Sequence, residues 1–435
     1  MLKHTSYLFN MAGETKIRKV AVVGYNRIPF ARINTNYTDA DNSDMLVAAL
    51  NGLIERYSLK GQRLGEVAGG AVIKHTRESS LIRDCILKTK LDPATPGVDL
   101  QQACATGIEA AVYIANKIAL GQIEAGIACG VDSTSNVPIV ASEHLRNVLL
   151  EASRAKTLGS RIKTFLKLKL KDFKPGVPGI DDTFTGLSMG GHTELTAKYY
   201  GISRQDQDEL ALSSHQRLAK AYDEGFFEDM VTPFKGLAVD NNLRRDTTLE
   251  KLAKLKPAFD KVSGTLTAGN STPLTDGASS VLIASEEWAA AHNLPVLAYI
   301  TFMETAAIEY IEHKENLLLS PVFAVNRMLK RAGYKLQDFD FYEIHEAFAA
   351  QVLTTLKIWE SDALSATFGL DALGKIDRNK LNVKGSSLAA AHPFAATGGR
   401  IIATMAKLLN QKGSGKGLIS VCAAGGQGIT MILEK

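Results

Sequence analysis

Cysteine is scarce in this sequence of 435 residues, which holds only four of them. They are Cys85, Cys104, Cys129 and Cys422. No two of them lie at the short spacing typical of metal sites, and four are too few for a disulfide-stabilised scaffold. We therefore predict a protein of a reducing compartment, the cytoplasm, with no bound metal.

Long apolar runs are missing as well. No stretch approaches the roughly 20 apolar residues that a membrane-spanning helix needs. Residues 1–19 lack the apolar segment of a signal peptide, and Met11 is an alternative start. Basic and aromatic residues do not alternate as they do in nucleic-acid-binding grooves. With 45% hydrophobic and 22% charged residues, the composition is that of a globular enzyme or binding protein, and the length predicts two or three domains.

Strand and helix patterns alternate in both halves of the sequence. Buried strands are predicted at 19–30, 66–73, 125–135 and within 339–348, and a strand hairpin at 417–434. Amphipathic helices are predicted at 44–59, 105–118, 323–334 and 399–412. Such alternation indicates an α/β fold built in layers. A shared Ala-Thr-Gly at 105–107 and 396–398 suggests two similar halves whose helix N-termini face a common site.

The segment between the halves, 135–272, differs in composition, and its residues 146–174 are strongly basic. They hold nine Lys or Arg residues against two acidic ones, a net charge of +7, whereas the whole chain carries +4. Apolar residues at helical spacing lie opposite the lysines, namely Leu158, Ile162, Phe165, Leu166 and Phe173. The pattern predicts an amphipathic helix that ends at Pro175. Its basic face is either simply solvated or contacts an anionic partner, a membrane surface or ligand phosphates.

Four residues are candidates for chemistry. Cys104 precedes the helix at 105–118, where the positive end of the helix dipole favours a thiolate, although a small buried apolar role explains it equally well. His345 follows the strand within 339–348, His392 precedes a helix, and Cys422 ends a strand before a glycine-rich turn. A single histidine is more often structural than catalytic. Together, however, a thiol, an imidazole base and free backbone N–H groups are what acyl transfer requires.

Five motifs along the chain resemble those of the thiolase family of acetyl-CoA acyltransferases. In order they are CATG, NSTPLTDGASS, HEAFAAQ, HPFAATGGR and CAAGGQG. The resemblance extends from about Val20 to Glu434 and implies the thiolase fold, a five-layer αβαβα sandwich of two similar halves with an inserted loop domain. The implied N-terminal half is 1–134, completed by about 273–293. The loop domain is then 135–272 and the C-terminal half 294–435.

The resemblance also implies a reaction and a role for each residue. The reaction is the cleavage of 3-oxoacyl-CoA by coenzyme A in fatty acid β-oxidation. Cys104 matches the nucleophile, His392 its base and Cys422 the acid that moves the proton at C2. His345 stands where many thiolases have Asn, and with His392 it matches the first oxyanion hole. The N–H groups of Cys104 and Ala424 match the second, and because many thiolases have glycine at the latter position, the alanine needs a φ that side chains permit.

Coenzyme A is implied as a substrate, and no cofactor or metal is implied. By resemblance, the residues that contact it are Ser188, Met189, Arg244 and Thr272. The His-Glu-Ala-Phe motif and the basic insert are similar to the β-subunit of the trifunctional enzyme of fatty-acid oxidation. This likeness implies a homodimer or homotetramer and a hydratase–dehydrogenase α-subunit as partner. Residues 146–174 would contact that partner or the membrane periphery, and no nucleic acid is expected.

Two alternatives stay open at this point. A β-ketoacyl synthase of the same fold uses one cysteine and two histidines, a set that Cys104, His345 and His392 would provide. Such an enzyme forms its carbanion by decarboxylating a malonyl unit, so it does not need Cys422. A non-catalytic acyl-CoA- or lipid-binding relative would be expected to lack a reactive residue, and none is missing.

Overall fold

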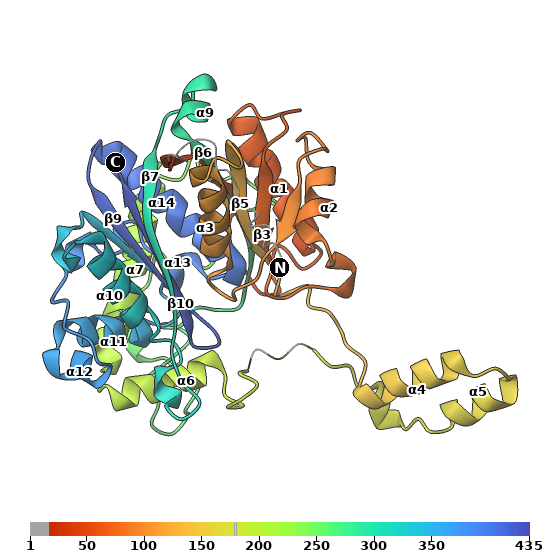
Figure 1. Ribbon diagram of the computed structural model, residues 1–435. Coiled ribbons are helices and arrows are strands. Elements are labelled where there is room, and N and C mark those ends of the chain that lie inside the picture. The colour runs from red at the N-terminus through yellow and green to blue at the C-terminus, as the bar shows by residue number, and fades with distance from the viewer. Residues whose placement is uncertain (1–16, 178, 180) are drawn as a thin grey trace, which may run out of the picture.

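Two mixed β-sheets, one from each half of the chain, form the framework of the computed structural model, which describes residues 17–177, 179 and 181–435 (Figure 1). The strands of the N-terminal sheet lie in the order β4 (Gly97–Asp99), β3 (Glu66–Gly70), β5 (Ala125–Asp132), β6 (Thr275–Ser285) and β1 (Val20–Arg27). Those of the C-terminal sheet are β7 (Ala298–Ala307), β10 (Gln427–Glu434), β9 (Lys416–Ala423) and β8 (Phe341–Ile344). A short pairing of β1 with β7 joins the two sheets, and β2 (Ala31–Arg32) pairs with β6.

The central strands are covered on both faces, which explains their apolar sequences. Every residue of β1, β5 and β6 is buried. β3 runs parallel to β4 and β5, whereas β6 runs antiparallel to β5 and β1. Because β6 comes after residue 272 in the chain, the polypeptide returns to the N-terminal sheet after the inserted segment. The proposed start of the N-terminal half at residue 1, like Met11, lies outside the described residues.

Helices cover the sheets in layers. α3 (Thr106–Ala119) and α14 (Thr397–Lys412) lie between the two sheets and share one hydrophobic core with the inner faces of both. α1 (Asn42–Arg56) and α2 (Leu81–Lys88) cover the outer face of the N-terminal sheet. α10 (Pro321–Ala332) and α11 (Ala349–Glu360) cover the outer face of the C-terminal sheet. The predicted αβαβα arrangement of five layers is confirmed.

The two central helices begin at the two Ala-Thr-Gly sequences, and their glycines allow them to meet closely. A Cβ atom at Gly107 would lie 2.6 Å from the carbonyl oxygen of Ala395, and one at Gly398 would lie 2.5 Å from the backbone nitrogen of Ile108. Neither helix could therefore carry a side chain at this crossing. The crossing brings the N-termini of both helices to one point, as the repeated sequence suggests.

The basic stretch forms a helical hairpin, so the prediction of one continuous amphipathic helix is wrong. The hairpin consists of α4 (Glu143–Arg154), α5 (Leu158–Phe165) and the 3₁₀ turn η2 (Leu170–Phe173). The chain reverses because the hydroxyl of Thr157 caps a new helix by accepting from the N–H of Ser160 at 3.2 Å. The hairpin stands apart from the layered body in Figure 1. The backbones of Val140 and Gly176 exchange two hydrogen bonds of 2.9 Å at its base.

The rest of the inserted segment packs on the body and shares its cores. It contains α6 (Met189–Tyr199), α7 (Arg204–Asp223) and α8 (Leu249–Ala253), whose buried side chains join the central and C-terminal cores and a small cluster beside α11. The remaining elements are η1 (Thr76–Glu78), α9 (Glu286–Ala291), η3 (Lys314–Asn316), η4 (Leu336–Asp338), α12 (Asp362–Thr367), η5 (Arg378–Lys380), α13 (Ser387–Ala390) and η6 (Phe394–Ala396). Among the described residues, no helix combines the length and apolarity needed to cross a membrane.

Candidate active site

Cys104 lies in a tight turn between β4 and α3. Ala103 has a positive φ of 46°, and the N–H groups of Ala105 and Thr106 donate to the carbonyls of Gln102 and Ala103 at 3.0 and 3.1 Å. The hydroxyl of Thr106 also donates to the carbonyl of Ala103 at 2.7 Å. The turn leaves the thiol of Cys104 partly exposed beside the first turn of α3.

His392 meets this thiol from the C-terminal half. Its Nε2 lies 3.1 Å from Sγ of Cys104, and its Nδ1 lies 2.5 Å from Oγ1 of Thr397, the first residue of α14. An Nε2 that is to take the thiol proton must be unprotonated, so Nδ1 carries the ring hydrogen and donates it to Thr397. Thr397 therefore orients the imidazole toward the cysteine.

Burial governs the ionisation of this pair. It raises the pKa of the Cys104 thiol to about 12. It also lowers the pKa of His392 to about 3, aided by the positive charge of Arg400. At neutral pH the pair is a thiol beside a neutral imidazole. The thiolate forms when His392 accepts the proton, and the favourable effect of the helix N-terminus on that thiolate stays a prediction.

The His345 imidazole lies beside that of His392, with the ring centroids 4.2 Å apart. Its backbone N–H donates to the carbonyl of Ser420 at 2.9 Å, which extends the β8–β9 pairing by one residue and fixes its position. Nδ1 lies 2.8 Å from the hydroxyl of Ser387. Nε2 is buried and has no partner among the described residues. Burial and the charges of His392 and Arg400 hold the pKa of His345 far below its ordinary value, so the ring is neutral.

The second thiol and the second backbone donor come from the turn that connects β9 and β10. Cys422 is buried, and both burial and the nearby Cys104 raise the pKa of its thiol. The backbone of Ala424 lowers the pKa of the Cys104 thiol and so opposes part of the effect of burial. In the described chain, the N–H groups of Cys104 and Ala424 donate to no other residue. Gly425 and Gly426 take φ values of 78° and 69°, whereas Ala424 avoids positive φ, as its side chain requires.

This geometry agrees with the family comparisons. The model of the thiolase N-terminal domain matches residues 20–287, and that of the thiolase C-terminal domain matches residues 294–435. The chain belongs to the thiolase family. This thiolase is 39% identical, over 424 residues, to the 3-ketoacyl-CoA thiolases of Yersinia pestis (strain Pestoides F) and Yersinia pseudotuberculosis serotype O:3 (strain YPIII). The alignments cover 96% of this chain and 97% of each relative.

Solved thiolase structures share the fold over the whole chain. The human mitochondrial 3-ketoacyl-CoA thiolase superposes with a TM-score of 0.80 at 29% identity, over 97% of this chain and all of that one. The acetyl-CoA acetyltransferase of Bacillus anthracis gives 0.81 at 28% identity, with the same coverage. The predicted family, α/β fold and acyltransferase class are confirmed.

The four residues of this thiolase predicted to contact coenzyme A lie on three separate segments. Thr272 is next to the site, since its N–H and hydroxyl both donate to the carbonyl of Ala347 at 3.0 Å, two residues after His345. Ser188 caps α6, whose first residue is Met189. Arg244 donates its backbone N–H to His215 at 3.2 Å, and burial lowers the pKa of its guanidinium. These four contacts stay predictions.

Several supporting residues of the thiolase site were not predicted. Glu346 accepts from the hydroxyl of Ser214 at 2.7 Å, the amide of Asn382 at 2.7 Å and the N–H of Leu388 at 3.2 Å. It thereby ties the His345 loop to α7 and α13. Of these residues, only Glu346 could have been predicted from the sequence, since it directly follows the candidate His345. The others become neighbours only when the chain folds.

No cluster of three or more His, Cys, Asp or Glu side chains suited to a metal occurs in the described part of the chain.

Proposed function

We propose that this chain is a 3-ketoacyl-CoA thiolase that cleaves 3-oxoacyl-CoA with coenzyme A, giving acetyl-CoA and an acyl-CoA two carbons shorter, in fatty acid β-oxidation. The observation that carries the proposal is the pairing of a thiol from one half of the chain with an imidazole from the other. Sγ of Cys104 lies 3.1 Å from Nε2 of His392, and Cys104 is in turn one of the groups that raise the pKa of the Cys422 thiol. The 39% identity to 3-ketoacyl-CoA thiolases over nearly the whole chain supports the same substrate class.

The first half of the reaction begins with a proton transfer. Nε2 of His392 takes the proton of Cys104, and the thiolate attacks the C3 keto carbon of the substrate. The C2–C3 bond breaks, its electron pair stays on C2, and the thiol of Cys422 protonates that carbon to release acetyl-CoA. The Nε2–H group that His392 has just gained from Cys104 and the neutral imidazole of His345 stabilise the enolate oxygen of the departing unit.

The second half transfers the shortened acyl group. The thiol of coenzyme A attacks the carbonyl of the thioester on Cys104, and its proton restores Cys422. The N–H groups of Cys104 and Ala424 stabilise the tetrahedral oxyanion, a role for which both are available because they donate to no other residue in the described chain. Cys104 leaves as a thiolate and recovers its proton from His392. The cycle consumes no other reactant, and coenzyme A is a substrate throughout.

The decisive experiment is a thiolysis assay with coenzyme A and a series from acetoacetyl-CoA to long 3-oxoacyl-CoA. We expect cleavage, and the series reports the preferred chain length. A synthase would instead decarboxylate a malonyl thioester and leave 3-oxoacyl-CoA intact. A non-catalytic acyl-CoA-binding protein would bind the substrate without turnover.

A homodimer or homotetramer is part of the proposal. β4 is the outermost strand of the N-terminal sheet, and its outer edge pairs with no strand among the described residues. An open edge of this kind can be continued by the same strand of a second copy. Since Cys104 follows β4 closely, such a contact would lie near the site. Sedimentation analysis tests it, and a monomer would contradict it.

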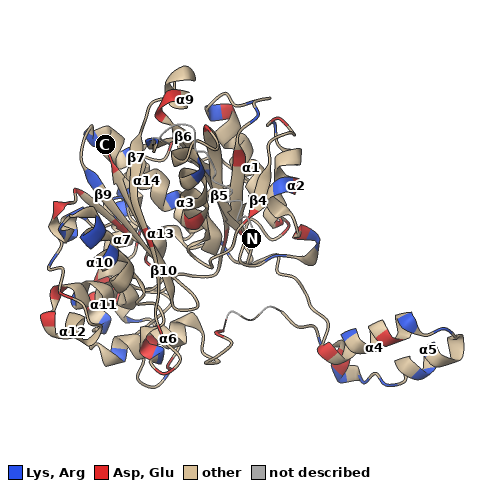
Figure 2. Cartoon of the chain, viewed as in Figure 1, with Lys and Arg blue, Asp and Glu red and all other residues tan. Residues whose placement is uncertain are grey.

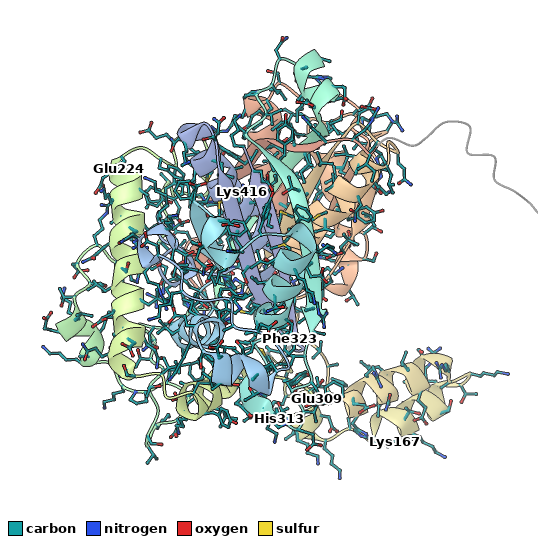
Figure 3. The ribbon with its side chains drawn as sticks, turned by 60° about the vertical axis from the view of Figure 1, so that its left-hand side comes forward. Lys167, Glu224, Glu309, His313, Phe323 and Lys416 are labelled. Atoms are coloured by element: carbon teal, nitrogen blue, oxygen red, sulfur yellow. The ribbon has the colours of Figure 1, made fainter. Side chains whose placement is uncertain are left out.

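We also propose that the hairpin, residues 136–177, docks on the anionic surface of a membrane. Its apolar side chains are bare, with Leu158, Leu166 and Leu170 exposed by 75%, 78% and 94%. Lys and Arg residues lie along the same helices (Figure 2), and the labelled side chain of Lys167 lies on the hairpin in Figure 3. Bare apolar residues beside lysines are typical of helices that bind anionic lipid. Docking of a hydratase–dehydrogenase α-subunit is the alternative, and the cytoplasm remains the predicted compartment.

A further inference from the structure

A chain of hydrogen bonds behind His345 determines which of its ring nitrogens carries the hydrogen. Nη2 of Arg400 lies 2.9 Å from Oγ of Ser387, and this Oγ lies 2.8 Å from Nδ1 of His345. A guanidinium group has donors only, so the Ser387 oxygen accepts from Arg400. In the described chain, Nδ1 of His345 is the one acceptor within hydrogen-bond distance of the Ser387 hydroxyl.

The opposite arrangement would leave a buried donor without a partner. If Nδ1 carried the hydrogen, Ser387 would accept from both sides, and its own hydroxyl hydrogen would have no acceptor. Ser387 is fully buried, and an unpaired donor in such a place costs more than one hydrogen bond contributes. Nδ1 therefore accepts from Ser387, and in the neutral ring the hydrogen lies on Nε2.

Nε2 is the nitrogen that has no partner. It is buried, on a ring whose centroid lies 4.2 Å from that of His392. We infer that Ser387 and Arg400 are positioning residues that hold His345 in the tautomer whose Nε2–H is free to donate to the enolate oxygen of the departing acetyl unit. The inference rests on the proposed function. It also explains why a histidine here needs support: the asparagine of many thiolases has an N–H donor in any state, whereas a neutral histidine has one only in the right tautomer.

Ser386 offers a matched control. Its hydroxyl lies 3.2 Å from the same Nη2 of Arg400 and is equally buried, but it has no hydrogen bond to His345. We expect Ser387→Ala to lower kcat of thiolysis about tenfold, the effect of losing one buried hydrogen bond. Ser386→Ala should change kcat less than threefold. An equal loss of kcat in Ser387→Ala and Ser386→Ala would show that both serines only support the structure, and it would overturn the inference.

A double-mutant cycle separates positioning from packing. In a His345→Asn background the donor is an amide, so adding Ser387→Ala should have no further effect on kcat. If Ser387→Ala is as costly there as in the wild type, the hydroxyl does not act through the tautomer of His345. The rate at which acetyl-CoA acylates Cys104 should stay within about twofold in Ser387→Ala, because that step uses the donors of Cys104 and Ala424.

The tautomer itself can be measured without any variant. In ¹⁵N spectra of the histidine-labelled wild-type protein, assigned with His345→Asn, we expect Nε2 of His345 to be protonated and Nδ1 to be a hydrogen-bonded acceptor. A protonated Nδ1 would overturn the inference even if Ser387→Ala fails to fold. Acylation of wild-type Cys104 without thiolysis would count against the proposed function instead, so the two failures are distinguishable.

Discussion

In most proteins apolar side chains are buried and polar ones are exposed, but the proposed catalytic centre and the hairpin both depart from this distribution. In the centre, two imidazoles, a guanidinium and the Cys422 thiol are buried between the two halves of the body, beside the partly exposed Cys104. In the hairpin, large apolar side chains are exposed to solvent. Both regions keep groups without partners: Nε2 of His345 in the centre, and Leu166 and Leu170 on the hairpin. Such groups are costly in the free protein. In both regions these are the groups that the proposed ligands would contact: the substrate in the centre and an anionic membrane at the hairpin.

The largest expected effect tests the centre at its nucleophile. Cys104→Ser should lower thiolysis at least about a thousandfold and abolish covalent acyl labelling, because a serine hydroxyl is not deprotonated by a neutral His392 as readily as a thiol. Mass spectrometry of the acylated peptide measures it. Cys85→Ser is the control, since Cys85 is buried in the outer N-terminal core beside Ser43. Label on Cys85 or Cys129 in the wild type would contradict the assignment.

The next effect separates the two thiols of the centre. Cys422→Ala should slow exchange of the acetyl-CoA methyl protons with solvent about a hundredfold or more, because it removes the acid at C2. Acylation of Cys104 should continue. Proton exchange followed by NMR, beside acyl labelling, measures both. Equal loss of the two activities would indicate a structural role for Cys422, and unchanged exchange would favour a synthase.

The third prediction tests whether the hairpin is independent of the centre. Replacing Lys163, Lys167, Lys171 and Lys174 by Gln should weaken binding to anionic vesicles at least about tenfold, since each lysine near such a surface contributes about 1 kcal/mol. Turnover of acetoacetyl-CoA should hardly change. Binding by the wild type should also fall with salt, because the Debye length shrinks to roughly 3 Å at 1 M.

A charge-matched variant of the body is the control for the hairpin. It replaces four exposed lysines, Lys60, Lys330, Lys335 and Lys375, by Gln, and vesicle binding should be nearly unchanged. Wild-type binding to the α-subunit but not to vesicles would replace the membrane with a protein partner. Loss of affinity for coenzyme A in the hairpin variant would place the hairpin at the mouth of the site.

The smallest effect concerns backbone strain in the centre. Ala391, just before His392, has φ 74° and ψ −179°, a conformation that alanine adopts at a cost of about 1–3 kcal/mol. Ala391→Gly relieves that strain but removes a buried methyl group. Ala390→Gly, one residue earlier in α13, only removes one. Thermal unfolding should show Ala391→Gly more stable than Ala390→Gly by about 1 kcal/mol or more. The reverse order would mean that position 391 is not strained.

The sequence predicted the parts of the molecule whose signals are local. The strands β1, β3 and β5, the hairpin of β9 and β10 and the two central helices were predicted because each has a pattern of apolar residues within one short segment. The central strand β6 and the edge strand β4 were not predicted, and the roles of the reactive residues stay predictions that rest on the family resemblance. The reversal at Thr157 was missed, because a periodic pattern does not show where a helix stops and turns back. Ser387 and Arg400 were missed for another reason. Their roles arise only when α13 and α14 meet His345, and nothing near them in the sequence marks that contact.

The hairpin is an insertion whose two ends are paired at its base. Val140 and Gly176 hold the two connecting segments together at the base of the hairpin with two hydrogen bonds, and from there one segment leads back to β5 and the other on to α6 (Figure 1). Removing 141–175 and closing the gap with a short turn would alter only the entropy of closing a surface loop, a cost that changes by about 0.6 kcal/mol for each doubling of loop length. We therefore expect a chain without 141–175 to keep the layers of its body.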